Sequence, residues 1–141
     1  MSRPLKILLI ASGVVLFLGA SLGVGRVLTA RGAEQSLLEQ LIADQNEGRT
    51  AAVVAGISGC GTSATCRDAV GRIVARTKDP GGHYMVLQIV QGTKISAGAS
   101  TGVSRIAWRP DGRLPIVECV TTRRSGTVVD GFRVEVLAVS K

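Results

Sequence analysis

Residues 5–24 read LKILLIASGVVLFLGASLGV, and apart from Lys6 this stretch carries no ionisable side chain. About 20 apolar residues in a helix span the hydrocarbon core of a bilayer, which is about 30 Å thick. A helix that is apolar on every side needs a large surrounding core if it is to be buried, and a chain of 141 residues is too short for one. The stretch therefore predicts a membrane-spanning segment that tethers or exports everything after it.

Two interpretations of this N-terminal segment are open. A secretory signal peptide combines a basic start, an apolar run of about 7–15 residues and a small-x-small cleavage site. Arg3 and Lys6 supply the basic start, but the apolar run continues past Leu18, and neither residues 21–23 nor residues 28–30 fit a cleavage site well. The pattern favours an uncleaved signal anchor over a cleaved signal peptide.

The charges beside the span nearly balance, so they give little information on its orientation. Arg3, Lys6 and the α-amino group precede the span, while Arg26 and Arg31 follow it. An anchor with so short a leading tail usually inserts with that tail inside. We therefore expect a single-pass protein in the cell membrane whose residues 26–141 are extracytoplasmic.

The remaining chain is strongly basic. Residues 49–141 contain 13 basic and 6 acidic side chains, and such an excess attracts anionic partners. The chain has 13 arginines but only 4 lysines, together with 18 glycines, a composition typical of a GC-rich bacterial genome. Outside a bacterial membrane the anionic partners are lipid headgroups, anionic envelope polymers or a partner membrane protein, although a basic surface also keeps a small domain soluble. Nucleic acid is an unlikely partner because aromatic side chains make up only 3% of the chain. The basic surface is expected at Arg67, Arg72, Arg76, Arg105 and Arg133.

The chain divides into an anchor at residues 1–25, a helical stalk at 26–48 and a small domain at 49–141. Four apolar residues of the stalk recur at helical spacing and form one stripe, at Leu37, Leu38, Leu41 and Ile42. This stripe fits a partner helix, the membrane surface or the protein's own domain. Within the domain, the apolar run at residues 50–57 fits a helix or a strand, and its alanines favour a helix. A second helix is expected to run to Thr77 with Ser63 as its cap. Strands are expected over residues 84–91, 103–109, 116–123 and 132–139.

The strand pattern also predicts a register. A two-residue turn at Asp111-Gly112 places Arg105 opposite Glu118, and a second turn at Ser125-Gly126 places Glu118 opposite Arg133. The outward face then carries a charge row, and the inward face carries Ile106, Trp108, Val117, Cys119, Phe132, Val134 and Val136.

The predicted fold is α+β, with one or two helices packed on a four-stranded antiparallel sheet. Helices followed by a strand meander are the layout of cystatin-like and NTF2-like folds, and a membrane helix before a sheet is the layout of type IV pilins. These are likenesses of architecture only. The pilin leader is absent and no Glu lies in the apolar run, so no family is assigned.

Three cysteines leave two pairings open in an oxidising compartment. Cys60 and Cys66 flank a short flexible turn, so a local disulfide is favoured, with Cys119 as a free buried thiol. A Cys66–Cys119 bridge between helix and sheet is the alternative. The cysteine spacing, with a single histidine at position 83, matches no common zinc site.

No catalytic or cofactor motif stands out in the sequence. The glycine-containing turn at residues 58–61 lacks the phosphate-loop pattern, and neighbouring strand residues such as Glu118 and Cys119 point to opposite faces. We therefore expect no enzyme, no cofactor and no metal, but a membrane-anchored binding or scaffolding domain of a bacterial envelope assembly. The alternatives are a pilin-like or secretion-system structural subunit and an NTF2-like domain that binds a small ligand.

Overall fold

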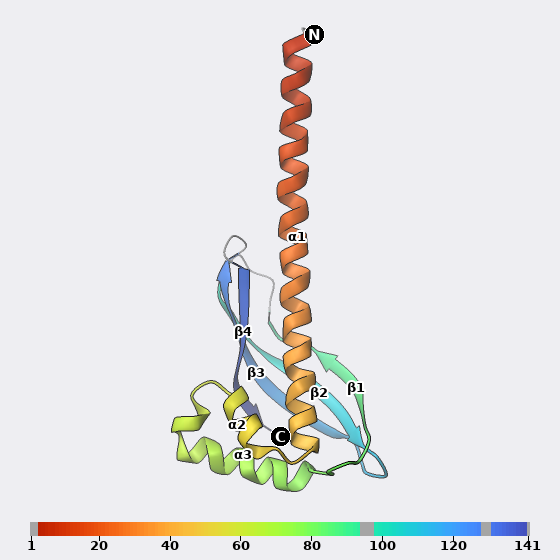
Figure 1. Ribbon diagram of the computed structural model, residues 1–141, viewed down its shortest axis with the longest axis vertical. Helices are drawn as coiled ribbons and strands as arrows, with labels where there is room; N and C mark the ends of the chain where they lie inside the picture. The colour runs from red at the N-terminus through yellow and green to blue at the C-terminus, as the bar shows by residue number, and fades with distance from the viewer. Residues whose placement is uncertain (1–2, 94–97, 128–130, 141) are drawn as a thin grey trace.

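The structure, a computed structural model, describes residues 3–93, 98–127 and 131–140. Within these residues, three α-helices lie against one four-stranded antiparallel sheet (Figure 1). The elements in chain order are α1 (Arg3–Asn46), α2 (Thr50–Gly56), the 3₁₀ turn η1 (Cys60–Thr62), α3 (Ala64–Thr77), β1 (Tyr84–Val90), β2 (Ser100–Pro110), β3 (Ile116–Thr127) and β4 (Gly131–Ser140). The predicted α+β class is confirmed.

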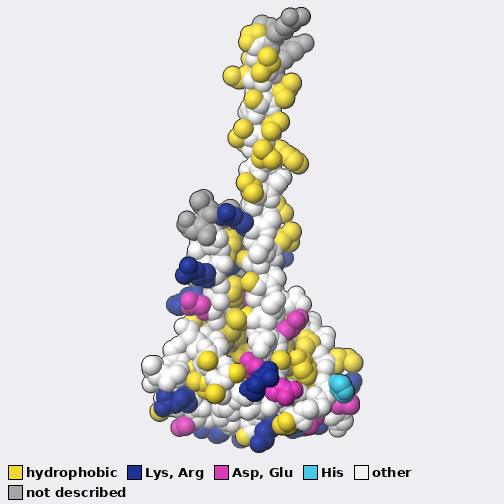
Figure 2. All heavy atoms as spheres, in the orientation of Figure 1, with side chains coloured by type: hydrophobic (Ala, Val, Ile, Leu, Met, Phe, Trp, Pro, Cys, Tyr) yellow, Lys and Arg dark blue, Asp and Glu magenta, His cyan; other side chains and the backbone are white. Residues whose placement is uncertain are grey.

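The longest element is α1, a single helix of 44 residues that extends for about 66 Å at a rise of about 1.5 Å per residue. Its N-terminal half protrudes from the domain, and hydrophobic side chains cover it in Figure 2. Leu16 and Phe17 are 71% and 72% exposed. In the described part of the chain, α1 is the one helix long and apolar enough to cross a membrane. The helix ends before Gly48, whose φ of 76° suits a glycine.

The short helices lie where the sequence predicts them. Ser63 caps α3, and its hydroxyl oxygen accepts a hydrogen bond from the backbone N–H of Cys66 at 3.2 Å. Val70 and Val74 of α3 are buried, and Val53 of α2 joins them in the core. Together α2 and α3 cover the end of the domain that lies farthest from the N-terminus (Figure 1).

The sheet has the strand order β1-β2-β3-β4, with every neighbouring pair antiparallel. The C-terminal half of α1 packs across its inner face, and the core lies between them. Trp108 is fully buried there, and the ring of Tyr84 meets it edge-on with a centroid distance of 6.1 Å. The core cluster consists of Leu38, Leu41, Ile42, Val53, Ile57, Cys60, Val70, Val74, Ile106, Trp108, Val120 and Val136.

The segment expected as a stalk contributes to this core. Residues 26–48 are helical up to Asn46. Within the stripe, Leu38, Leu41 and Ile42 are buried in the core, and Leu37 is partly buried against it. The stripe therefore packs on the protein's own domain, which was one of its three predicted positions. From Ala30 onward, α1 is a structural part of the domain.

The predicted register between β2 and β3 is wrong by one residue. Arg105 pairs with Cys119, and Ile106 pairs with Glu118. A turn does form at Asp111-Gly112, where the N–H of Arg113 donates to the carbonyl of Pro110 at 3.2 Å. However, β3 begins only at Ile116, so the connection is longer than two residues. One extra residue in the connection moves each β3 side chain to the opposite face.

The predicted turn at Ser125-Gly126 is also wrong. Both residues belong to β3, and its ladder with β4 continues to the pair Thr127 and Gly131. The connection between the two strands lies outside the described residues. Arg133 consequently pairs with Ser125 instead of Glu118.

These two corrections remove the predicted charge row. Glu118 is fully buried on the inner face, whereas Val117 is 50% exposed on the outer face. An outward ion pair that the structure does describe on this sheet joins Arg123 to Glu135 at 2.7 Å. Cys119, predicted to face the core, therefore lies on the outer face and is partly buried.

Candidate functional site

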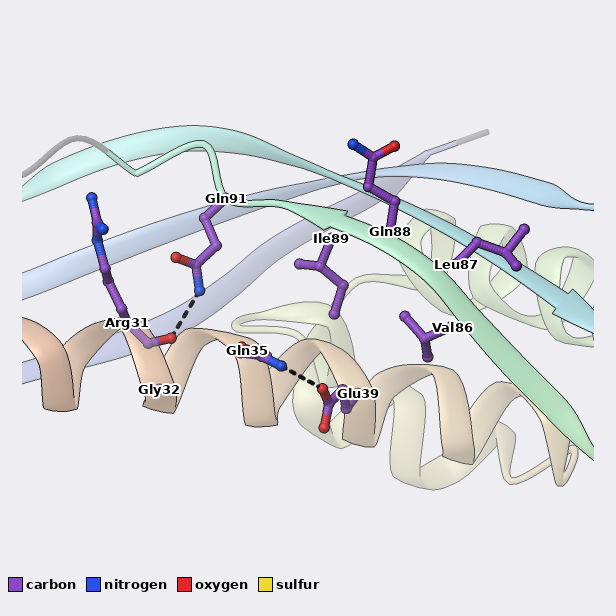
Figure 3. Close-up of a pocket in the computed structure, with 9 residues that line it drawn as sticks. All are labelled: Arg31, Gly32, Gln35, Glu39, Val86, Leu87, Gln88, Ile89 and Gln91. Atoms are coloured by element: carbon purple, nitrogen blue, oxygen red, sulfur yellow. Dashed lines mark hydrogen bonds between the residues drawn. The ribbon is translucent and has the colours of Figure 1, made fainter.

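A groove runs between α1 and the edge strand β1, with a volume of about 580 Å³ (Figure 3). We call it the α1–β1 groove. One wall comes from α1 and consists of Arg31, Gly32, Gln35 and Glu39. The other comes from β1 and the residue after it, and consists of Val86, Leu87, Gln88, Ile89 and Gln91.

Two features of the sequence open the groove. The register between β1 and β2 shifts at Leu87, between Val86 and Gln88, and an extra residue of this kind bends a strand and increases its twist. On the facing wall, Gly32 has no side chain, and a Cβ atom built there meets nothing within 4 Å. The strand bends at this position, and the facing helix has no side chain at Gly32 to fill the space. A groove therefore remains between the helix and the strand.

The two ends of the groove carry opposite charges. At the end nearer the apolar half of α1, Gln91 Nε2 donates to the backbone carbonyl of Arg31 at 2.8 Å. Toward the other end, Gln35 Nε2 donates to Glu39 Oε1 at 2.8 Å. Arg31 and Glu39 are both exposed, and eight residues of helix separate them by about 12 Å. Val86 and Ile89 are half-buried between these ends and point toward α1 in Figure 3.

A buried carboxylate fixes α1 to the sheet beside this groove. Glu34 is 1% exposed, and its oxygens accept hydrogen bonds from three hydroxyl groups. Ser104 of β2 donates at 2.6 Å and Thr122 of β3 at 3.1 Å, while Thr93 donates from the segment after β1. A carboxylate that accepts this many hydrogen bonds is stabilised in the interior. The cluster therefore holds the position of the groove's helical wall.

A second buried carboxylate lies farther along α1. Glu118 of β3 is fully buried and accepts a hydrogen bond from Gln45 Nε2 at 3.1 Å. Its partner Gln45 is 11 residues beyond Glu34, which corresponds to about 16 Å along the helix. The two carboxylates therefore do not form an acid–base pair. Within the described residues, no three His, Cys, Asp or Glu side chains come together as a metal site requires.

Cys60 and Cys66 form a disulfide in the structure, with their Cα atoms 5.3 Å apart. This is the local pairing that the sequence favours, and it joins η1 to the first turn of α3. Cys119 has a free thiol on the other side of the sheet. The disulfide thus stabilises the corner that leads into α3 and lies away from the groove.

The five arginines expected as a basic surface fall into two separate groups. Arg67, Arg72 and Arg76 are exposed on α3, while Arg105 and Arg133 are exposed on β2 and β4, next to residues that face the core. Lys and Arg side chains in Figure 2 are likewise spread over distant parts of the domain. The structure does not bring these five side chains together into one patch.

The α1–β1 groove was not predicted from the sequence. One signal for it is present, because β1 carries no charge on either face, which is unusual for an exposed edge strand. The other wall gives no signal, because nothing in the sequence shows which side of α1 meets β1. The chain matches no protein-family model, no curated protein and no solved structure.

Proposed function

We propose that this protein is a membrane-anchored, non-enzymatic binding or scaffolding domain on the outer side of the cytoplasmic membrane, as an accessory part of a bacterial envelope assembly. The observation that carries the proposal is the continuity of α1. One helix contains both an exposed apolar stretch that is long enough to span a bilayer and the stripe that forms the domain's core.

This continuity holds the domain at a defined height. Residues 5–24 correspond to about 30 Å of helix, and the first buried residue, Ala30, lies about 9 Å beyond them. The distance is too short for a flexible linker, so the domain lies close to the headgroups. A rigid support of this kind suits a protein whose task is to present a binding surface near the membrane.

The packing between α1 and the sheet favours a role in binding a partner at the surface. It gives less support to catalysis or to binding a small ligand inside the domain. Glu34 and Glu118 are each engaged in hydrogen bonds that join α1 to the sheet. Trp108 and its neighbours fill the space between helix and sheet, where an NTF2-like domain that binds a small ligand needs a cavity. The open α1–β1 groove is a surface feature that a partner could occupy.

A pilin-like structural subunit is the second candidate. The observation that favours it is again α1, because an exposed apolar half followed by a half packed on an antiparallel sheet is the pilin layout. In this candidate, the exposed apolar half of α1 is the surface through which neighbouring copies assemble. An accessory binding domain instead keeps its apolar half in lipid.

A fusion of alkaline phosphatase, which is active only outside the cytoplasm, to the C-terminus tests the topology. We expect phosphatase activity and a full-length protein in the membrane fraction. Activity of a cytoplasmic reporter in its place would contradict the proposal, as would an N-terminus newly formed near residue 24 or 31.

Cross-linking of the intact membrane protein separates the two candidates. The double variant Leu16→Cys with Cys119→Ser keeps the Cys60–Cys66 disulfide and places its one free thiol in the span, where cross-linking reports contacts between apolar halves. A binding domain gives few cross-links there, whereas a polymerising subunit gives a ladder of high multimers. Such a ladder would favour the structural subunit.

A further inference from the structure

The two edge strands of the sheet, β1 and β4, differ in whether another segment of the chain pairs with them. At β4, the residues after α2 pair with the edge at Val136, because Ile57 forms a parallel bridge with Val136 and the Ser58 N–H donates to the Val136 carbonyl at 2.7 Å. At β1, the last strand in the sheet order, no further strand follows among the described residues. An edge strand exposes a row of backbone N–H and C=O groups that can pair with another strand.

The open edge is also unusually apolar. Its sequence is YMVLQIV, and Met85, Leu87 and Val90 are exposed by 56%, 46% and 49%. Natural proteins normally protect such an edge with charges, proline or a covering element. Among the described residues, the element that faces this edge is the α1 wall, and the groove between the wall and β1 has a volume of about 580 Å³.

A second copy of this chain in the same membrane does not fit the open edge. The strand β1 passes Glu39 first and Arg31 last, so it runs opposite in direction to α1. Copies anchored in one bilayer have parallel α1 helices, and their β1 strands are therefore parallel to each other. An antiparallel pairing like every other pairing in this sheet would require one copy to be inverted.

We propose that the α1–β1 groove binds an extended peptide segment of a partner protein, which adds to β1 as a fifth antiparallel strand. This inference rests on the proposed function and specifies the partner's chemistry. Strand addition supplies main-chain hydrogen bonds, and alternate side chains of the peptide then face α1. The wall of α1 therefore determines which sequences fit.

The charges on that wall give the expected sequence pattern. Arg31 and Glu39 lie about 12 Å apart along the helix, and an antiparallel strand advances about 3.4 Å per residue. Side chains on one face of a strand recur every second residue, so positions i and i+4 match this separation. Because the added strand runs from Arg31 toward Glu39, the partner segment carries an acidic residue first and a basic residue four positions later. The residue between them faces Gln35.

Binding of synthetic peptides to the full chain in lipid nanodiscs tests the pattern. The probe is a nine-residue peptide of alternating Thr and Val with Asp at position 3, Gln at position 5 and Lys at position 7. The control has the same composition with Asp and Lys exchanged. We expect the probe to bind about tenfold more tightly, since two exposed attractions replace two repulsions.

A charge-reversed protein provides the decisive comparison. Arg31 and Glu39 are both exposed, so the double variant Arg31→Glu with Glu39→Arg is expected to fold. It should prefer the exchanged peptide over the probe by a similar factor. An unchanged preference in the double variant would overturn the proposal.

Two further measurements separate strand addition from simple charge attraction. N-methylation of one alternating set of peptide residues should abolish binding while methylation of the other set leaves it intact, because only one set of N–H groups faces β1. Gly32→Phe should fill the groove and reduce binding at least tenfold, whereas Ser36→Phe, exposed on α1 outside the groove lining, should not.

Equal tolerance of both methylated sets would exclude strand addition. Absence of binding by both peptides, in a protein with the expected topology and no multimer ladder, would overturn the groove assignment alone. The membrane-anchored scaffold would then stand, so the two proposals fail separately.

Discussion

The two halves of α1 contrast in side chains and in surroundings. Residues 5–24 are almost entirely apolar, yet they protrude from the domain, and none of the side chains described there is buried. The half that enters the domain carries Glu34, Asp44, Gln45 and Asn46, and all four are at most 8% exposed. Whether a residue of α1 is buried in the domain therefore depends on the groups that surround it and not on its hydrophobicity alone. The apolar half matches a lipid environment, and the polar residues of the other half match specific hydrogen-bond partners.

The largest difference between the halves should come from their leucines. Leu38→Ala removes a fully buried side chain from the core and should lower the free energy of unfolding by about 2–5 kcal/mol. Leu16→Ala, at 71% exposure on the protruding half, should change it by less than about 0.5 kcal/mol. Urea denaturation of both variants in the same micelles gives the two values. A reversed order would mean that the domain's core does not include α1.

Within the half of α1 that enters the domain, a buried and an exposed carboxylate should differ because only the buried one, Glu34, accepts hydrogen bonds from the sheet. Glu34→Ala leaves the hydroxyl groups of Ser104 and Thr122 without their acceptor and should lower the free energy of unfolding by about 2–3 kcal/mol. The matched control is Glu39→Ala, five positions along and exposed, which should stay within about 0.5 kcal/mol. Equal midpoints in a denaturant titration would contradict the hydroxyl cluster.

Substitutions at the neighbouring residues Glu118 and Val117 should have smaller effects on stability, and these effects depend on the register of β3. Glu118→Ala removes the acceptor of Gln45 and should cost about 1–3 kcal/mol of stability, whereas Val117→Ala, at 50% exposure, should cost less than about 1 kcal/mol. The register predicted from strand alternation requires the opposite order. Denaturant midpoints of these neighbouring variants therefore decide which face of β3 meets α1.

The smallest effect concerns the glycines of α1 and its end. Gly32→Ala should stabilise the protein by about 0.5–1 kcal/mol, because Gly32 is exposed within the helix and a Cβ atom there meets open space. Gly48→Ala should destabilise it by about 1 kcal/mol, since φ at Gly48 is 76°. Thermal unfolding with circular dichroism detects the two opposite shifts. A stabilised Gly48→Ala variant would show that α1 ends differently.

Local patterns predicted the elements well, because each depends on nearby residues. The span at residues 5–24, the Ser63 cap and the turn between Cys60 and Cys66 are all readable from a few adjacent positions. The type and order of the helices and strands followed from the same kind of information. Hydrophobic periodicity of 3.6 or 2 residues carries most of this signal.

Long-range relations were not predictable in this way. The register of β2 and β3 depends on the length of their connection, and no residue pattern in positions 111–115 indicates that this connection exceeds a two-residue turn. Glu34 looks like a solvent-facing helical residue, because its partners Ser104 and Thr122 lie 70 and 88 positions away. The α1–β1 groove likewise depends on which side of α1 the sheet selects.

The unbroken helix also fixes the rotation of the domain about the membrane normal. Each residue turns an α-helix by about 100° and advances it by about 1.5 Å. The five residues between position 24 and Ala30 therefore determine the direction in which the α1–β1 groove opens around the membrane normal. Inserting one residue there rotates the groove by about 100° about the helix axis, whereas inserting seven residues, about two turns, nearly restores its original direction. A partner that contacts both the span and the groove must fit this direction. The number of residues between position 24 and Ala30 therefore helps to determine which partner binds.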